Sequence, residues 1–344
     1  MVFTNFSSFT LVILFLVSTI AIWVSGIKLT KAVDAITSHF GLGEAVGGMV
    51  FLAIITNLPE IAITIVAASH RDYDIAISNL LGGIAIQTLV LVLIDIFGVG
   101  RSAPLTQKGH SKVLIIEGVA LIFILSIVIM GAQFPNTLIY FRTTPFEWLI
   151  VLTWLFTLFL ITKMIDKNQK QKPEERVHHL RMPKSIFKGS INSAYIVLTI
   201  GALITLFAGW SLELSGEILA NRYHISGVIF GGTLLALCTA LPEISTGIAS
   251  AKIRDYNMAV SDIFGGNAFL PVLFMMASLI GGDAILPNLK STDIYLTTLG
   301  ILLTGIYMVG MVVHSKKQIY RMGIDSFIVL IVYIIGIWGL FTLI

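Results

Sequence analysis

The sequence predicts an all-α polytopic membrane protein with ten transmembrane helices, arranged as two inverted five-helix repeats. Three observations lead to this fold class: the composition, the length of the apolar segments and an internal duplication. The chain has 344 residues, of which 56% are hydrophobic and only 12% are charged. A soluble domain carries roughly 25% charged residues. The composition therefore excludes a soluble enzyme, a disordered chain and a conventional nucleic-acid binder.

Ten apolar segments define the expected helices. Each is near the ~20 residues that a helix needs to cross the hydrocarbon, and none shows the alternating pattern of a transmembrane barrel. Amphipathic stretches at Lys28–Phe40 and Ser211–Tyr223 are expected to continue the first and sixth helices toward the membrane surface. The segments lie at residues 8–27, 43–69, 75–99, 113–132, 145–165, 189–212, 225–251, 257–281, 292–313 and 323–344.

The basic residues indicate the orientation. The longest polar stretch, residues 163–188, contains eight Lys or Arg residues, and positively charged loops stay in the cytoplasm. Counting through ten spans places 18 of the 22 basic residues inside and leaves Arg71, Arg142, Arg222 and Lys290 outside. We therefore expect an integral, multi-pass protein of the plasma (cytoplasmic) membrane with both termini outside.

The same polar stretch divides the chain. Residues 1–165 are expected to form the N-terminal five-helix repeat, residues 166–186 a basic cytoplasmic linker and residues 187–344 the C-terminal five-helix repeat. The linker is either a solvated connector that obeys the positive-inside rule or a lipid-binding regulatory loop. The connector is the simpler interpretation, because it needs no additional function.

An internal duplication relates the two halves. Thr56–Ala85 matches Thr239–Ala268 at an offset of 183 residues, with 15 of 30 positions identical. The matches include Pro-Glu, Arg-Asp-Tyr and Gly-Gly groups, which apolar composition alone does not explain. Equivalent segments are five spans apart, an odd number, so the halves must be inverted. Inverted repeats with interrupted helices are typical of alternating-access transporters.

Two glutamates, Glu60 and Glu243, occupy equivalent positions in the middle of apolar segments. A carboxylate at this depth costs several kcal/mol unless it is paired or faces a cavity. Each follows a proline, which frees the carbonyls of Ile55 and Cys238 from helical hydrogen bonds. Carboxylates and free carbonyls are hard oxygen ligands that Ca²⁺ and Na⁺ accept. A single Pro-Glu would fit a kink with a protonated glutamate, but the duplicated pair favours a cation site.

Neighbouring hydroxyls and amides would complete such a site. Asn79 is equivalent to Asp262, which would supply a third charge or a protonation site. Alternatively, these small polar residues mediate close helix packing, as we expect for the Gly-Gly pairs at 82–83 and 265–266. The neighbours are Thr56, Asn57, Ser78, Asn79, Gln87, Thr239, Ser261, Asp262 and Asn267.

Other charged residues have structural interpretations. Asp95 and Glu117 lie nearer the ends of spans and are expected to reach lipid headgroups. The Arg-Asp-Tyr groups at 71–73 and 254–256 are expected to fix turns through ion pairs. We find no metalloprotease, nucleophile-elbow, P-loop or intramembrane-protease motif, so we expect neither an enzyme nor a cofactor. The single Cys238 excludes an internal disulfide.

At these residues the chain resembles the cation/calcium antiporter superfamily, which includes sodium/calcium and calcium/proton exchangers. Residues 56–60 (TNLPE) and 239–243 (TALPE) look like its G-T-S-L-P-E motif, and residues 78–83 (SNLLGG) and 261–266 (SDIFGG) look like G-N-x-x-G-S. The resemblance implies that Glu60 coordinates Ca²⁺ together with its repeat partner. It also implies that the first and sixth helices slide across the rest.

The resemblance adds further ligands and shows departures. It implies that the carbonyls of Thr56 and Thr239 bind the ion. The motif serine is replaced by glycine at 83 and 266, and the later Asn or Asp ligand falls on Gln87 and Leu270. Asn57 resembles the G-N-x-x-E of the proton-coupled branch. The metal-ion ligands predicted from all these observations are Glu60, Glu243, Thr56, Thr239, Asn57, Asn79, Asp262 and Asn267.

Together, these features predict a secondary active antiporter that exchanges Ca²⁺ for Na⁺ or H⁺, with inorganic cations and the lipid bilayer as its partners and no nucleic acid. The alternatives are a calcium/proton exchanger, an uncoupled cation channel, or a degenerate cation-sensing protein of the same fold. Sequence alone leaves the coupling ion, the stoichiometry, the direction and the oligomeric state open.

Overall fold

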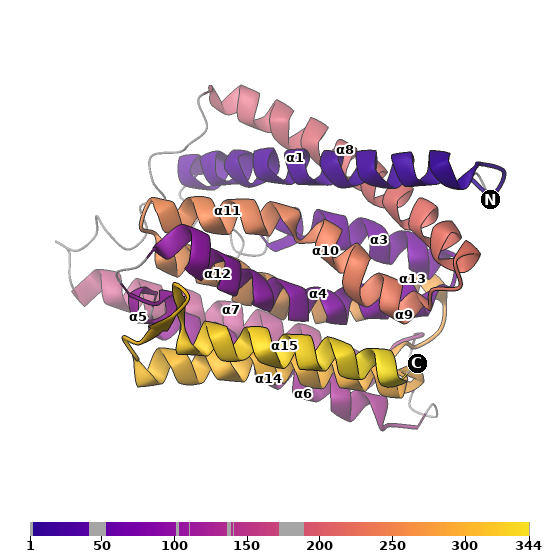
Figure 1. Cartoon of the computed structure of the whole chain (residues 1–344). Helices are drawn as coiled ribbons and strands as arrows, with labels where there is room; N and C mark the ends of the chain where they lie inside the picture. Colours follow the sequence, from indigo (N-terminus) through magenta and orange to yellow (C-terminus); the bar gives the residue numbers. More distant parts are fainter. Residues whose placement is uncertain are drawn as a thin grey trace.

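The computed structural model describes residues 3–40, 53–100, 103–109, 111–135, 139, 141–171 and 189–343. Almost all of these residues are helical, as predicted (Figure 1). A hairpin of two-residue strands, β1 (Gln318–Ile319) and β2 (Met322–Gly323), is the only sheet in this part of the chain.

Eight helices among the described residues are long and apolar enough to cross a membrane. They account for eight of the ten predicted segments. Two of them continue as expected, α1 to Phe40 and α8 to Arg222. The eight spans lie at Ser8–Val33, Tyr73–Val99, Lys112–Ala132, Pro145–Met164, Ile191–Arg222, Tyr256–Gly281, Ser291–Val313 and Ile324–Leu343.

The other two predicted segments contain the Pro-Glu pairs, and both are interrupted. In the second half, Gly227–Thr239 and Leu241–Lys252 bend by 43° at Ala240 and count as a ninth span when taken together. In the first half, α3 is the short apolar helix Leu58–Ser69, and residues 41–52 lie outside the described part. Ten helices in two repeats therefore stays a prediction.

The helices of the first half are α1 (Ser8–Phe40), α3 (Leu58–Ser69), α4 (Tyr73–Ile94), the π-helix η2 (Asp95–Val99), α5 (Leu105–Lys108), α6 (Lys112–Ala132) and α7 (Pro145–Gln171). Those of the second half are α8 (Ile191–Arg222), α9 (Gly227–Ile229), the π-helix η5 (Phe230–Leu235), α10 (Ala236–Thr239), α11 (Leu241–Lys252), α12 (Tyr256–Phe269), η6 (Leu270–Val272), α13 (Leu273–Gly281), η7 (Leu286–Asn288), α14 (Ser291–Val313) and α15 (Ile324–Leu343). The predicted linker begins inside α7, and its residues 172–186 lie outside the described part.

The bundle has a closed centre and an outer helix pair. The window of α4 is the most enclosed of the candidate spans, and α4 packs against α12, α14 and η5. The helices α1 and α8 pair with each other along one side, at the top of Figure 1. Large apolar side chains on their outer faces, such as Leu16 and Phe207, are exposed, as expected for residues that contact lipid tails.

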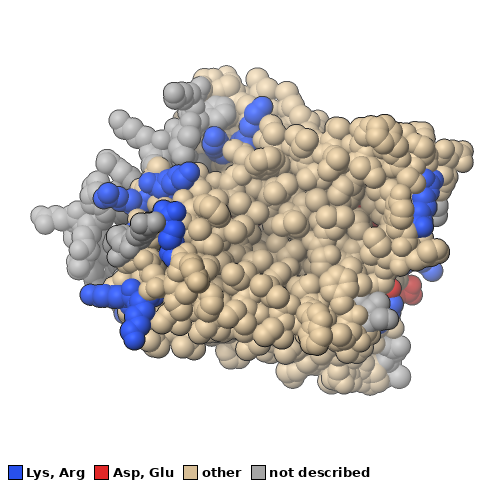
Figure 2. Space-filling view, in the orientation of Figure 1, with Lys and Arg blue, Asp and Glu red and all other residues tan. Residues whose placement is uncertain are grey.

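Charge is confined to the two ends of the bundle. In Figure 2, Lys and Arg side chains gather at both ends and leave a broad uncharged band between them. The two termini lie at the same end (Figure 1), which an even number of membrane crossings requires.

The two Arg-Asp-Tyr turns are fixed by caps and not by the predicted ion pairs. Asp72 accepts a hydrogen bond from the Ile75 amide at 3.2 Å, and Asp255 accepts one from the Met258 amide at 3.0 Å. The arginine before each cap has a left-handed φ, +60° and +68°. An aspartate is a favourable N-cap because its carboxylate pairs with an orphan amide of the first turn.

Candidate ion-binding site

The two Pro-Glu segments place a glutamate in the first turn of a helix. Proline lacks the amide that a continuous helix needs, so the chain breaks before it and a new helix starts with proline near its first position. Thus α3 starts at Leu58 and α11 at Leu241. The positive end of the helix dipole and the orphan amides of the first turn favour an anion there, which suits Glu60 and Glu243.

These two carboxylates approach each other from opposite halves of the chain. Glu60 is completely buried, and its Oε1 accepts a hydrogen bond from Gln87 Nε2 at 3.1 Å. The Thr239 hydroxyl is also within hydrogen-bonding range of Glu60. Glu243 is buried beside it, close enough for their charges to interact. One oxygen of each glutamate has no hydrogen-bond partner.

An amide pair lines the same region. Asn57 is buried and donates from Nδ2 to the Ala53 carbonyl at 2.8 Å. A Cβ placed on Gly266 would lie 3.7 Å from Asn57 Nδ2 and 3.9 Å from Gln87 Oε1. The missing motif serine therefore leaves space that these amides face. Thr56 lies beside them and receives a longer contact from Asn57 Nδ2, at 3.4 Å.

The remaining predicted ligands occupy different surroundings. Asn267 is buried and donates to the Ile84 carbonyl and to Thr88 Oγ1, which leaves its Oδ1 unpaired. Asn79 is completely buried, and neither atom of its amide has a partner. Its repeat counterpart Asp262 accepts a hydrogen bond from Thr246 Oγ1 at 3.1 Å.

Glu117 was interpreted as reaching the headgroups, and the structure shows that this is wrong. It is buried on α6, and its Oε1 accepts a hydrogen bond from Ser261 Oγ at 2.7 Å. Its charge also acts on Asp262, which in turn acts on Glu243. Four carboxylates, Glu60, Glu243, Asp262 and Glu117, therefore form a row, which we call the acidic row. Position along the span could not reveal it, because the contact with Ser261 joins distant segments.

Asp95 was also expected at the headgroups, and it too is buried. Its carboxylate accepts hydrogen bonds from the Leu105 amide at 2.8 Å, the Gly323 amide at 2.7 Å and Ser326 Oγ at 2.8 Å. Because it ties η2, α5 and the β-hairpin together, its role is structural.

Two glycines let the outer helices touch the Pro-Glu segments. A Cβ on Gly26 of α1 would lie 2.6 Å from Pro242, and a Cβ on Gly209 of α8 would lie 2.6 Å from Ala62. Both are too close for a real side chain. Gly26 and Gly209 are themselves 183 residues apart, the offset of the duplication, so the same close contact occurs in both halves.

The comparisons with known proteins agree with this architecture. The family model for the sodium/calcium exchanger protein matches residues 10–165 and 193–342. The inner membrane protein YrbG of Escherichia coli (strain K12) is 27% identical over 283 residues, which cover 81% of this chain and 83% of that protein.

Solved structures share the fold. The sodium-calcium exchanger NCX_Mj has a TM-score of 0.61 at 20% identity, with 97% of this chain and 99% of that chain covered. The H⁺/Ca²⁺ exchanger CAX has a TM-score of 0.65 at 11% identity, with 96% and 87% covered.

Proposed function

The chain belongs to the sodium/calcium exchanger protein family, and on this premise we propose that it exchanges Ca²⁺ for a monovalent cation, Na⁺ or H⁺. It is an integral multi-pass membrane protein and a cation antiporter, a secondary transporter and not an enzyme by family. The mechanism proposed is alternating access, with the ion held between Glu60 and Glu243.

The buried glutamate pair is the observation that carries this proposal. Two ionised carboxylates supply a charge of −2, which matches one divalent cation or two monovalent charges. Their unpaired oxygens, with the Gln87 amide and the Thr239 hydroxyl beside them, offer the oxygen ligands that Ca²⁺ prefers. Because the same carboxylates cannot hold both ions at once, the two ions compete, and this competition couples their movements.

The moving part in this proposal is the α1–α8 pair, and the layout is the ten-helix inverted repeat. The contacts at Gly26 and Gly209 support it, since a side chain at either position would collide with the Pro-Glu segment on which the helix lies. Movement of the pair would expose the glutamates to one side of the membrane and then to the other.

The acidic row favours H⁺ as a second candidate for the coupling ion. Asp262 and Glu117 continue from Glu243 with hydroxyls of Thr246 and Ser261 bound to them. Leu270, which replaces a ligand in the family motif, removes one oxygen from the site. Fewer neutral ligands weaken Na⁺ binding, whereas carboxylates bind protons readily in a low-dielectric setting.

Flux through proteoliposomes tests the function. Ca²⁺ uptake is measured with an outward Na⁺ gradient at equal pH, with an outward H⁺ gradient without Na⁺, and with neither gradient. We expect uptake with one gradient only, and this identifies the coupling ion. Equal uptake without any gradient would instead show an uncoupled channel. Absence of flux with retained Ca²⁺ binding would show a cation sensor.

The proposed orientation places the predominantly basic end in the cytoplasm and both termini outside, in the cytoplasmic membrane. The support is the 18-to-4 distribution of basic residues together with termini at one end of the bundle. Protease treatment of intact cells should remove an epitope tag from either end of the chain. Protection of both tags until the cells are lysed would reverse the orientation.

A further inference from the structure

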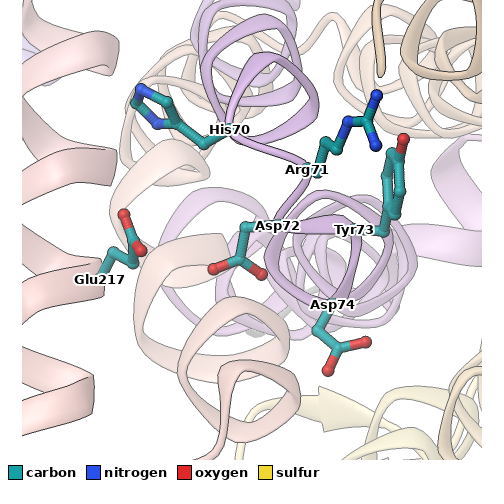
Figure 3. Close-up of a pocket in the computed structure, with 6 residues that line it drawn as sticks. All are labelled: His70, Arg71, Asp72, Tyr73, Asp74 and Glu217. Atoms are coloured by element: carbon teal, nitrogen blue, oxygen red, sulfur yellow. The ribbon is translucent and has the colours of Figure 1, made fainter. Parts of the chain in front are cut away.

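A separate cluster of metal-ligand side chains lies at the end of the bundle that carries the termini. His70 lies in the turn between α3 and α4, while Glu213 and Glu217 lie one helical turn apart on α8. One ligand atom from each lies within 4.8 Å of the others. Figure 3 shows His70 and Glu217 approaching from these two elements, with Arg71 extending to the other side beside Tyr73.

A cavity opens beside this cluster. It has a volume of about 350 Å³ and is lined by residues of the turn and of α8. The Asp72 carboxylate faces it in Figure 3. Burial raises the pKa of Asp72 above its ordinary value, which is the direction expected where negative charge lacks a compensating cation. A hydrated ion can therefore enter the cluster from the surface.

The state of Glu213 points independently to a ligand. Its side chain is completely buried, yet neither carboxylate oxygen has a hydrogen-bond partner. An ionised carboxylate without a partner in such a place is strongly unfavourable. Its nearest charged neighbours include Glu217 and Asp72, which repel it. A cation bound between Glu213 and His70 would compensate this charge.

We propose that His70, Glu213 and Glu217 bind a divalent transition-metal ion such as Zn²⁺, and that the ion fastens α8 to the α3–α4 turn. An imidazole nitrogen with carboxylate oxygens is a common ligand set for zinc, which is completed by water when three protein ligands are present. The imidazole separates this site from the exchange site, because Ca²⁺ is bound by oxygen ligands.

The position gives the ion a consequence for transport, and this part rests on the proposed function. The helix α8 belongs to the pair proposed to move, whereas the α3–α4 turn belongs to the enclosed centre. A metal ion that bridges them holds α8 in one position and stops the exchange cycle.

The site occurs in one half of the duplication only. At the offset of 183 residues, the counterparts of the three ligands are Thr30, Asp34 and Ile253. Because isoleucine cannot bind a metal, the equivalent turn at the opposite end lacks the imidazole ligand. We therefore expect Zn²⁺ to act from the end that carries the termini and not from the other.

Isothermal titration calorimetry of the full chain in detergent, with its purification tag removed and ZnCl₂ as titrant, tests the site. One site is expected, with an affinity at least tenfold lower in His70→Ala and in Glu217→Gln. His224→Ala is the matched control, since this exposed histidine follows α8 at the same end. Absence of Zn²⁺ binding, or an unchanged affinity in both ligand variants, would overturn the proposal.

Proteoliposomes test the fastening. Zn²⁺ on the terminus-bearing side should inhibit Ca²⁺ flux in the wild type and in His224→Ala, and at least tenfold more Zn²⁺ should be needed in His70→Ala. Zn²⁺ binding without inhibition would overturn the fastening of α8. If no protein transports Ca²⁺, the proposed function fails, while the calorimetric result still decides whether the metal site exists.

Discussion

The helix pairs α3–α4 and α11–α12 share a backbone design but differ in chemistry. Both start with Pro-Glu, both turn through an arginine with positive φ, and both are capped by aspartate. Beyond the turn, Ser78 donates to the backbone carbonyl of Gly227 at 3.2 Å, whereas Ser261 donates to the carboxylate of Glu117 at 2.7 Å. Duplication thus preserved the elements that break and turn the chain, while the side chains around them diverged.

The divergence places negative charge on one side of the glutamate pair. Asp262 extends the acidic row in the second half, and Asn79 at the equivalent position is neutral. Glu117 has Gly300 at its equivalent position. The two halves are therefore equivalent for movement and unequal for ion chemistry. The following variants test this distinction, from the largest expected effect to the smallest.

The glutamate pair should be the most sensitive position, and both halves should respond alike. Glu60→Gln or Glu243→Gln leaves a charge of −1 against a divalent ion in a buried site. We expect Ca²⁺ flux to fall at least ~100-fold in each, which corresponds to about 2.7 kcal/mol. Uptake of radioactive Ca²⁺ measures this, with Asp74→Asn at the surface as control. Intact flux in both glutamine variants would show that the site has been assigned wrongly.

The paired glycines test mechanical equivalence. Gly26→Ala and Gly209→Ala each force a Cβ into a contact of 2.6 Å. Overpacking typically costs 1–3 kcal/mol, so we expect flux to slow about tenfold in both variants. Gly305→Ala is the control, because nothing lies within 4 Å of a Cβ there. A large effect in one variant alone would mean that only one of the two helices moves.

The acidic row tests chemical inequivalence. Asp262→Asn and Glu117→Gln should slow H⁺-driven Ca²⁺ uptake about fivefold, roughly 1 kcal/mol, while Ca²⁺ affinity at the glutamate pair changes less. Asn79→Asp, at the position equivalent to Asp262, should not increase the rate, because no equivalent of Glu117 stands beside it. Initial rates at several external pH values measure this. An unchanged rate in both variants would remove the acidic row from the transport path.

The caps should give the smallest effect on transport. Asp72→Ala and Asp255→Ala each remove one hydrogen bond to a first-turn amide, which costs about 1 kcal/mol of unfolding free energy. The temperature of unfolding in detergent should fall by similar amounts in the two variants. If one fell much further, the two turns would not be structurally equivalent.

Most of the fold could be predicted from the sequence, because membrane helices have a direct signature in length and polarity. The interruptions at Asn57 and Ala240 could also be predicted, since proline removes a defined hydrogen bond. The partners of Glu117 could not. A carboxylate five residues inside α6 fits a headgroup contact equally well, and only packing against Ser261 decides the matter.

The cluster at His70 escaped for a similar reason. Its ligands come from a turn of the first half and a helix of the second, so no local motif joins them. Glu213 and Glu217, spaced by one helical turn, gave a weak signal that an amphipathic helix explains equally well. The equivalence of Gly26 and Gly209 was visible at the offset of the duplication, but an isolated pair of glycines in apolar helices is common.

Both termini at one end of the bundle have a practical consequence for protein engineering. Two copies can be joined in tandem by a soluble linker that never crosses the lipid, so each copy keeps its natural topology. Such a concatemer can carry Glu60→Gln in one unit only. Its turnover, compared with that of the single chain, would report directly on whether neighbouring copies work independently.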